Sequence, residues 1–441
     1  MFTFLSQLAL IAGASIGSAQ SPVNRAPDAP APSPVAAACC GVSAVPAPPP
    51  PQGTNKGLLN EPLILSSLVD AINSRTRNEG DLSSGPYLKF GAGVPGAGWI
   101  AIGPGYKHSF SERLLFDASG TVSWRRYLNG RARLELRPLG NRNLVLGGQV
   151  LGQDWTQVNY FGLGLQSREE DRSSYRLRAS DFSGYVILKP GNVLDLRARV
   201  GQLNRPRISE ATGWNKSDYP DTLTLFSGLT DVAAPGLAVQ PKFWHADVSA
   251  SLDTLDHPGH PTRGLFLEAA ASQFDDRDFD RFSFRRYEAT AIAFLPIVGN
   301  RWTLGARAIA IASTTSGTNQ VPFYMMPSLG QAVLRGFDTG RFSDRNLVAL
   351  NVESRWALFK HMDIAVFGDF GSVASRFKAL DSSDRESSYG VGLRLHTGAT
   401  TFFRLDAARP KNGSWRMVLK LYESLRPARD QRWNTVVPVV R

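Results

Sequence analysis

The chain repeats one two-residue pattern over most of its length, and this pattern limits the fold more than any other feature. From about Gly85 to Leu425, apolar and polar residues alternate in one short run after another. Side chains of a β-strand point alternately to its two faces, so each run predicts a strand with one apolar and one polar face. About sixteen such runs predict an all-β protein, and no segment shows the strand–helix–strand rhythm of an α/β enzyme.

The two faces of these runs indicate the environment that each one meets. Between residues 113 and 127, Leu114, Phe116 and Trp124 lie on the apolar face, whereas Asp117 lies on the polar face. Across the chain, Arg and Asp crowd the polar face, and the apolar face ends in Trp, Phe and Tyr. A charged interior and an aromatic-ended exterior are typical of outer-membrane barrels. We therefore predict a transmembrane antiparallel β-barrel of about 16 strands in a Gram-negative outer membrane, rather than a large soluble β protein.

The segment before these runs carries the marks of export. Residues 1–19 are apolar and rich in small residues, which predicts a signal peptide cleaved before Gln20, although no Lys or Arg precedes the apolar run. Residues 20–57 are rich in Pro and Ala and predict an extended linker. Lipid attachment at Cys39 is the alternative form of processing, which the distance from the apolar stretch disfavours.

Two short segments flank the predicted barrel, which spans residues 85–425. Residues 58–84 carry Leu, Val and Ile at helical spacing between Glu61 and Arg75, which predicts a short amphipathic helix that plugs or braces the barrel. Residues 426–441 form a polar tail after the last strand. We expect this tail to fold into the lumen, unless the barrel ends at a different residue.

The chain is basic, with a formal net charge of +11 from 49 Lys and Arg against 38 Asp and Glu. The basic residues are spread over the polar positions of many strands and form no basic arm, so we expect no nucleic-acid partner. The charge instead predicts a positive lumen that attracts anionic segments, or basic loops that meet lipopolysaccharide phosphates. Outer-membrane lipids and lipopolysaccharide are therefore the predicted partners of the barrel surface.

The stretch from residue 328 to 373 combines an arginine with two acids. Arg335 and Gly336 lie between two strand-like runs, and Glu353 and Asp369 lie on the polar faces of the next two strands. A guanidinium can bind a carboxylate through two parallel hydrogen bonds. We therefore expect the loop around Arg335 to fold into the barrel and to be held there by charge, with Gly336 allowing a sharp turn.

These motifs resemble the C-terminal barrel of the BamA/TamA superfamily, the bacterial surface antigen family. Leu334-Arg335-Gly336-Phe337 resembles the signature at the tip of that family's inward-folded sixth extracellular loop. Phe367-Gly368-Asp369-Phe370-Gly371 is similar to the family's F-x-D-x-G strand motif. The resemblance implies a loop-lock motif and a set of lumen partners. The loop-lock residues are Arg335, Gly336 and Phe337, and the lumen partners are Glu353, Phe367, Asp369 and Gly371.

Two further segments extend the resemblance, and two features depart from it. The turn from Asp253 to Gly264 is similar to an acidic turn with P-T-R-G before a barrel strand, and Tyr160–Gly164 is similar to the start of a strand. Assembly members of the family usually carry polypeptide-transport-associated domains, for which the roughly sixty residues before the predicted barrel leave no room. The tail after the last strand is the second departure, since most outer-membrane barrels end with that strand.

Catalytic and metal-binding interpretations find little support in the sequence. The six His are scattered. Asp253, Asp256, His257 and His260 lie in a turn with Pro and Gly that the family resemblance explains. A lipase needs an exposed serine beside a base, and no His stands in an obvious partner position. We therefore predict that the protein is not an enzyme and that it has no catalytic residues, no metal and no cofactor.

The resemblance implies a protein that inserts or translocates client polypeptides, including unfolded ones, through a lateral seam. We expect the first and last strands, near Gly98–Lys107 and Trp415–Leu421, to meet at a weak seam whose edge pairs with a client strand. The alternative function is a passive outer-membrane channel whose Arg-rich lumen passes anionic solutes. An inserted Arg335 loop predicts a small and irregular conductance, which separates the two functions.

Overall fold

The computed structural model describes most of the chain beyond residue 56. The predicted signal peptide, the linker up to residue 56 and Cys39 lie outside the described residues, so these predictions stay untested. The described residues are 57–76, 84–91, 101–137, 143–213, 218–229, 232–257, 259–299, 301–380, 384–425 and 429–436.

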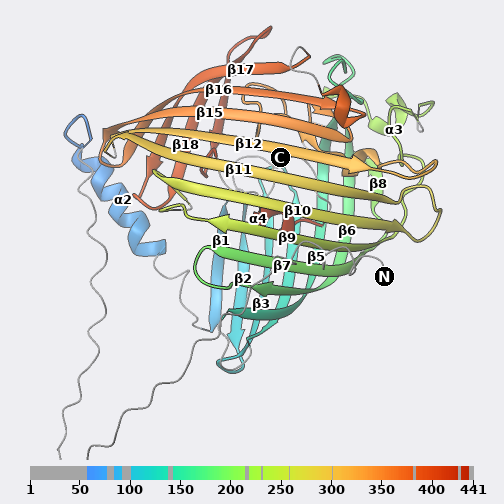
Figure 1. The fold of residues 1–441 in the computed structure, drawn as a ribbon, viewed down its shortest axis with the longest axis horizontal. Helices are drawn as coiled ribbons and strands as arrows, with labels where there is room; N and C mark the ends of the chain where they lie inside the picture. The colour runs from blue at the N-terminus through green and yellow to red at the C-terminus, as the bar shows by residue number, and fades with distance from the viewer. Residues whose placement is uncertain are drawn as a thin grey trace, which may run out of the picture. The chain divides into compact units, whose positions relative to one another are not determined.

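One antiparallel sheet of 17 strands dominates the fold (Figure 1). The short β8 (Arg207–Glu210) pairs with β6 as a side branch. The other sixteen strands pair in chain order, which confirms the predicted all-β class and strand number. They are β1 (Gly85–Gly91), β2 (Ala101–Ser109), β3 (Leu114–Ser123), β4 (Leu128–Leu136), β5 (Leu144–Tyr160), β6 (Ser173–Leu188), β7 (Leu194–Leu203), β9 (Phe243–Asp253), β10 (Gly264–Asp276), β11 (Phe284–Val298), β12 (Trp302–Thr314), β15 (Asn346–Phe359), β16 (Met362–Ala374), β17 (Glu386–His396), β18 (Thr401–Pro410) and β19 (Arg416–Lys420).

The remaining elements are short and lie in the connections or near the ends of the described chain. A separate two-stranded sheet lies between β12 and β15. In the part of the chain that the structure describes, no helix is long and apolar enough to cross a membrane. These elements are α2 (Leu63–Thr76), α3 (Thr222–Leu225), η3 (Phe323–Met325), β13 (Ser328–Leu329), β14 (Phe342–Ser343), η4 (Phe377–Ala379) and α4 (Arg429–Asn434).

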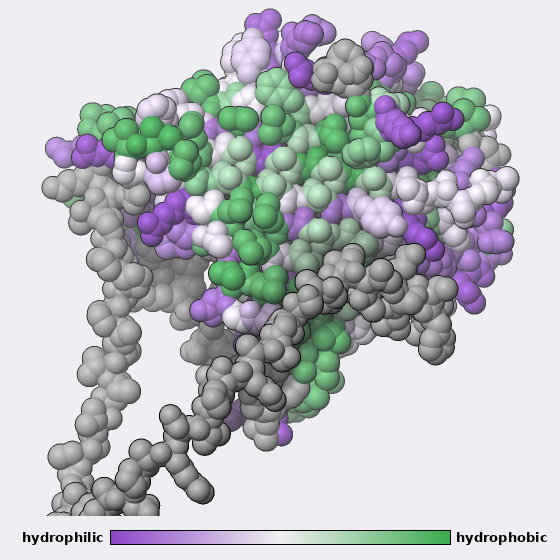
Figure 2. Space-filling view, in the orientation of Figure 1, coloured by the Kyte–Doolittle hydropathy of each residue, from purple (hydrophilic) through white to green (hydrophobic). Residues whose placement is uncertain are grey.

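The strands bury charged side chains on one face and expose apolar side chains on the other. Along β16, Ile364 and Val366 are 39% and 47% exposed, whereas Asp363, Phe367 and Asp369 are buried. Figure 2 shows apolar residues spread over the outer surface of the strands in view. This arrangement is the reverse of a soluble protein and matches a barrel in lipid, whose interior is polar.

The segment before α2 binds the hairpin that joins β15 to β16. The backbone N–H groups of Leu58 and Leu59 donate to carbonyl oxygens of this hairpin at 2.9 and 2.8 Å. In the first turn of α2, Leu63 and Ile64 are 86% and 84% exposed. The predicted helix is therefore present, but its exposed first turn does not enter the interior. Its lead-in segment braces the hairpin instead.

The two end strands of the meander differ from the expectation. The structure begins the meander with β1, and the segment expected as the first strand, Gly98–Lys107, overlaps β2. Gly85 of β1 pairs with Lys107 of β2, so the sequence pattern missed one short strand. Among the described residues, β1 has a residue-by-residue register with β2 alone, and β19 has one with β18 alone.

Candidate functional site

The long loop between β12 and β15 folds back against the inner face of the sheet. Leu329, Val333 and Leu334 of this loop are fully buried, because they pack with apolar side chains of three strands. Gly371 of β16 makes room for the loop, since a Cβ there would lie 2.9 Å from Leu329 Cδ1. The strand residues of this cluster are Ile309, Ile311, Leu347, Ala349 and Val373.

Arg335 lies buried on this loop, and all three of its guanidinium nitrogens bind carboxylates. Its Nε and Nη2 donate to the two oxygens of Asp369 at 2.8 and 2.7 Å. Its Nη1 donates to Glu353 at 2.6 Å, and its backbone N–H donates to Asp369 at 3.1 Å. Such bidentate, charge-assisted bonds are the strongest kind of side-chain hydrogen bond. The structure therefore brings the predicted arginine and both predicted acids together.

The other predicted residues shape the space around this guanidinium. The ring of Phe367 lies face-on to Arg335, with Cζ 3.5 Å from the ring centroid. Gly336 has a φ of +95°, a backbone conformation that favours glycine. Phe337 packs edge-on against Phe342 of the same loop, with ring centroids 5.4 Å apart. Phe337 therefore supports the fold of the loop rather than the charged contacts.

Sequence reasoning missed the rest of the charged cluster. Glu353 also accepts bonds from Arg394 at 2.9 and 3.1 Å, and Arg394 donates to Asp406 at 2.5 Å. Arg355 bridges Glu353 and Glu423, with its closest nitrogen–oxygen contacts at 2.8 and 2.5 Å. Arg355 lies on β15 with Glu353, and the others come from two further strands, β17 and β18, and from the tail. The alternation of apolar and polar residues could have placed the strand residues of this cluster on inward faces. Their mutual contacts depend on strand register, which the alternation does not give.

The cluster balances its charge in a buried environment. Four arginines (335, 355, 394 and 404) face four carboxylates (353, 369, 406 and 423), and every one of these side chains is at most 4% exposed. Although burial disfavours the charged form, Asp369 and Glu353 hold the pKa of Arg335 above its usual value. Removal of one partner would leave a buried charge uncompensated, which costs about 3–5 kcal/mol.

The tail leaves β19 and enters the same interior. Ser424 donates to Glu353 at 3.0 Å, and its carbonyl oxygen accepts a bond from Arg307 of β12 at 3.2 Å. Leu425 is 1% exposed and packs in an apolar cluster on the inner wall. The wall residues of that cluster are Phe266, Ile292 and Phe294. The tail therefore begins inside the charged cluster and continues across β10 and β11.

The helix α4 extends this path to the opposite wall. Arg432 donates to Glu268 of β10 at 2.9 Å. Trp433 packs against Tyr185 of β6, and the guanidinium carbon of Arg199 lies 5.0 Å from its ring centroid. Figure 1 shows α4 behind the strands β9 to β11, in agreement with these contacts to strands on both sides. The described part of the tail therefore fills interior space, as expected for residues beyond 425.

The turn between β9 and β10 is built around one carboxylate. Asp256 accepts bonds from the hydroxyl of Thr262 at 2.5 Å and from the backbone N–H of Thr262 and His257, both at 2.9 Å. These local bonds shape the turn. The four residues Asp253, Asp256, His257 and His260 therefore do not converge as one ligand set.

His260 points instead toward Asp363 and His396, and their donor atoms lie within 4.8 Å of one another. The Nε2 atoms of both histidines are 3.3 Å from the two oxygens of Asp363. The backbone N–H of Gly398 donates to Nδ1 of His396 at 3.1 Å, so a neutral ring carries its proton on Nε2. A metal-binding histidine donates from its second nitrogen, whereas His396 accepts there. The trio fits a hydrogen-bonded carboxylate better than a metal site.

The segment Tyr160–Gly164 marks the end of a strand, not the start that its sequence suggested. β5 ends at Tyr160, and the backbone N–H of Gly164 donates to the carbonyl oxygen of Ser343 in the inserted loop at 2.8 Å. Gly162 and Gly164 have φ values of +89° and +84°, which let the chain turn away from the sheet. This segment therefore contacts the same loop that carries Arg335.

Comparisons with known proteins agree with this geometry. The model of the Omp85 superfamily domain matches residues 168–415. BamA from Haemophilus ducreyi, in a structure lacking POTRA domains 1–3, aligns with a TM-score of 0.56 and 13% identity over 77% of this chain and 69% of that chain. No curated protein matches the sequence.

Two structures of CdiB align less well. CdiB from Acinetobacter baumannii has a TM-score of 0.44 and 12% identity over 76% of this chain and 58% of that chain. CdiB from Escherichia coli has a TM-score of 0.44 and 13% identity over 77% and 61%. The alignment with BamA therefore indicates a shared fold. The family match covers more than half of the chain and includes the inserted loop. The protein belongs to the Omp85 superfamily and is an outer-membrane β-barrel of the protein assembly and translocation type.

Proposed function

We propose that this protein inserts or translocates client polypeptides through a lateral seam between β1 and β19. The unequal pairing of the strands carries the proposal. β18 and β19 share five residue pairs, whereas β10 and β11 share eleven. A strand held by few pairs separates more easily, and a free strand edge is a template for another strand. A client strand would therefore pair with β1 or β19 when the two part.

The charged cluster is proposed to stabilise the strands next to β19, so that they stay paired when β19 separates from β1. Asp406 lies on β18, the partner of β19, and is paired with Arg394 of β17. Arg355 of β15 binds Glu423, which follows β19 closely in the chain. The Arg335 loop completes the cluster through Glu353. In this proposal the cluster locks the loop and anchors the last strands, so that separation is confined to the seam.

The contents of the interior argue against a passive channel. The Arg335 loop and the tail both lie inside, and the tail contacts walls formed by β6 and by β10. A path for anionic solutes would need an open lumen lined by free cations. The buried Arg335, Arg394 and Arg432 are instead engaged by carboxylates. A filled lumen is compatible with a protein that handles its clients at a seam in the barrel wall and does not conduct solutes along the barrel axis.

A disulfide across the seam tests the proposal. Leu88 of β1 and Met417 of β19 both point outward, at 62% and 64% exposed. If β1 and β19 meet at the seam, cysteines at these two positions, with Cys39 and Cys40 changed to serine, should crosslink upon oxidation, and a failure to crosslink would contradict the seam. We expect the crosslinked protein to remain folded but to lose client insertion in proteoliposomes, because the strands can no longer part.

The matched control joins two strands that are already paired. Ile102 of β2 and Val122 of β3 are cross-strand partners with similar outward exposure, at 41% and 43%. A disulfide between cysteines at these positions should leave client insertion unchanged. Full insertion by the seam-crosslinked protein would overturn the proposal and favour the passive channel.

A further inference from the structure

Glycines interrupt the outer face of β3, β4 and β5 at one level. Gly120 pairs with Gly130, and Gly130 pairs with Gly152. A Cβ at any of these three positions would meet no atom within 4 Å. The inward Gly147 is different, since a Cβ there would lie 2.4 Å from the ring of Tyr185. Glycine weakens a strand and often marks the approach of a ligand. Packing within the protein explains Gly147 but not the outer row.

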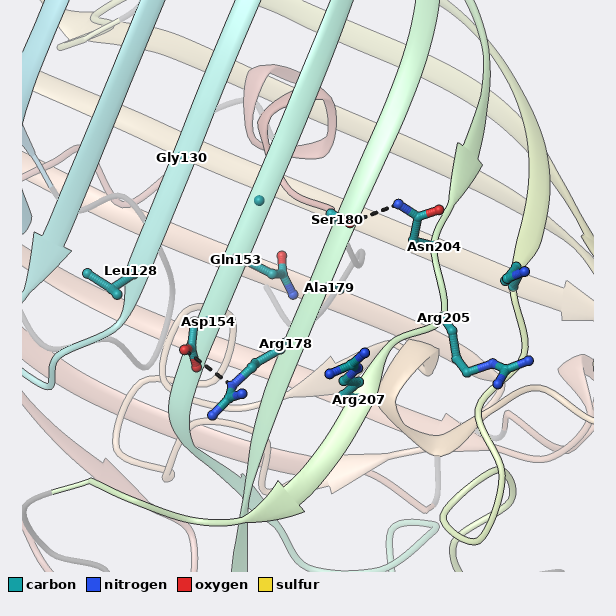
Figure 3. A pocket seen from close by; sticks show the side chains of 12 residues that line it. Leu128, Gly130, Gln153, Asp154, Arg178, Ala179, Ser180, Asn204, Arg205 and Arg207 are labelled. Carbon is teal, nitrogen blue, oxygen red and sulfur yellow. Dashed lines mark hydrogen bonds and ion pairs between the residues drawn. The ribbon is translucent and has the colours of Figure 1, made fainter.

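The glycine row opens onto a hollow of about 760 Å³ on the outside of the barrel (Figure 3). One carboxylate, Asp154, lines it and lies 3.4 Å from Arg178. Arg205 pairs with Asp278 at 2.9 Å, and Arg207 has no ion pair with any residue that the structure describes. Basic side chains therefore outnumber acids in this hollow. The four basic residues are Arg178, Arg205, Arg207 and Lys242.

A second hollow of about 720 Å³ lies on the same outer face, further along the strands. Its floor contains Gly148 and Gly184, which pair with each other across β5 and β6. Gly148 is four residues from Gly152, a separation of roughly 13 Å along a strand. The walls of this hollow are apolar. They include Phe116, Leu134, Val150, Phe182, Val200 and Trp244.

We propose that the two hollows together bind one phosphorylated lipid of the outer leaflet. The basic hollow takes the phosphate groups, and the apolar hollow takes an acyl chain. The basic hollow adjoins the strand ends that are joined by the long connections 161–172 and 204–242, whereas the opposite ends of β6 and β7 are joined by the short connection 189–193. In outer-membrane barrels the long loops are extracellular, so the basic hollow faces the outer leaflet.

The charge and shape of the hollows carry this assignment. A basic cluster at the membrane surface attracts lipid phosphates. The apolar hollow is not filled by side chains of the protein, so an acyl chain of a lipid can lie in it against the barrel wall. The inference goes beyond client insertion and does not depend on it, because it concerns the lipid-facing surface of β3 to β9.

Binding of bisphosphorylated lipid A to the delipidated full-length protein in detergent tests the inference. We expect the wild-type protein to prefer lipid A over its dephosphorylated form. Joint replacement of Arg205→Ala and Arg207→Ala should weaken binding of lipid A roughly tenfold, because two surface cations are lost. The matched control is Arg376→Ala with Lys378→Ala, which removes two exposed cations from another loop and should leave binding unchanged.

A second variant tests the hollow itself. Gly152→Leu should fold, because the space beside Gly152 is open, and it should reduce lipid A binding by filling that space. Wild-type binding by this variant, or equal binding of dephosphorylated lipid A, would overturn the inference. Tight binding of inorganic phosphate alone would show a simple anion site and contradict it. Dimers in the ultracentrifuge that Gly152→Leu disrupts would assign the hollow to a second copy of the chain instead.

Discussion

Arg335 and Arg432 are both buried arginines inside the barrel, but their surroundings differ. Arg335 is 3% exposed and uses Nε, Nη1 and Nη2 to bind two carboxylates. Arg432 is 5% exposed and reaches Glu268 at 2.9 Å and Glu288 at 3.4 Å through Nη2 alone, while its Nε and Nη1 find no hydrogen-bond acceptor among the described residues. One buried guanidinium is therefore fully bound and the other is partly bound.

This difference separates a permanent contact from one that can be released. A fully bonded buried ion pair is lost at high cost, because every partner would be left without compensation. A guanidinium with two unbonded nitrogens already carries part of that cost, so its departure loses less. We therefore expect the Arg335 loop to stay in place when the protein works. The tail around Arg432 is expected to be the interior part that moves.

The largest effect is expected at Arg335. Arg335→Glu places a third acid beside Glu353 and Asp369 and should destabilise the folded barrel by about 3–5 kcal/mol or prevent folding. Heat-modifiable migration in gels and unfolding in urea would measure this loss. The exchange of Arg335→Asp with Asp369→Arg should recover part of it. If Arg335→Ala leaves migration, abundance and protease protection of the loop unaltered, the lock does not exist.

A smaller effect is expected at Arg432. Arg432→Gln keeps one donor for Glu268 but removes the charge, so it should lower stability by about 1–3 kcal/mol. It should also loosen the tail and give larger, steadier openings in planar bilayers. Arg168→Gln is the control, because Arg168 forms an exposed pair with Glu170 that contributes little. Openings like those of the wild-type protein would show that the tail does not restrict the lumen.

The smallest effect concerns pH at the base of the tail. Burial lowers the pKa of His260 to about 3, in a site with His396, Asp363, Arg355 and Glu423. The unfolded chain therefore takes up a proton near pH 6.5 that the folded protein resists. The contribution of His260 to the free energy of unfolding is fully present above pH 6.5. It should fall by about 1 kcal/mol for each pH unit below that value.

His260→Gln should remove this slope, since it leaves no ring to protonate. Urea unfolding of both proteins at pH 6.5 and pH 5.5 would measure the difference. Glu423 titrates lower, because Arg355 overcomes the effect of burial and holds its pKa at about 2. An equal slope in both proteins would place the pH sensitivity elsewhere.

Sequence alone predicted the parts of the structure that depend on local pattern. The two-residue alternation predicted the strands and their faces, because side chains of a strand must point to opposite sides. The pattern did not identify β1 as the first strand, because its sequence GPYLKFG is short and holds two glycines and one proline. It also predicted a strand start at Tyr160–Gly164, because a glycine-rich segment that precedes a strand has the same sequence character as one that follows a strand.

The candidate site likewise contains residues that the sequence pattern predicted and residues that it missed. Positions on the polar faces placed Glu353 and Asp369 on the interior side, and the gap between two strands placed Arg335 in a loop. Arg394, Asp406 and Glu423 were missed, because no local pattern pairs residues that are far apart in the chain. Their contacts follow from the register of β15 to β18, in which Gly392 pairs with Asp406. The functional role of the lock stays a prediction.

The sequence by itself determined that this chain forms a barrel with a charged interior and an apolar exterior, since alternation and composition act residue by residue. Only the tertiary structure decided which charges meet, where the tail lies and where the outer wall is hollow. Those features depend on strand register, and a shift of one residue would move every side chain to the other face. The energy that selects one register comes from packing and ion pairs between distant strands, which no single segment contains.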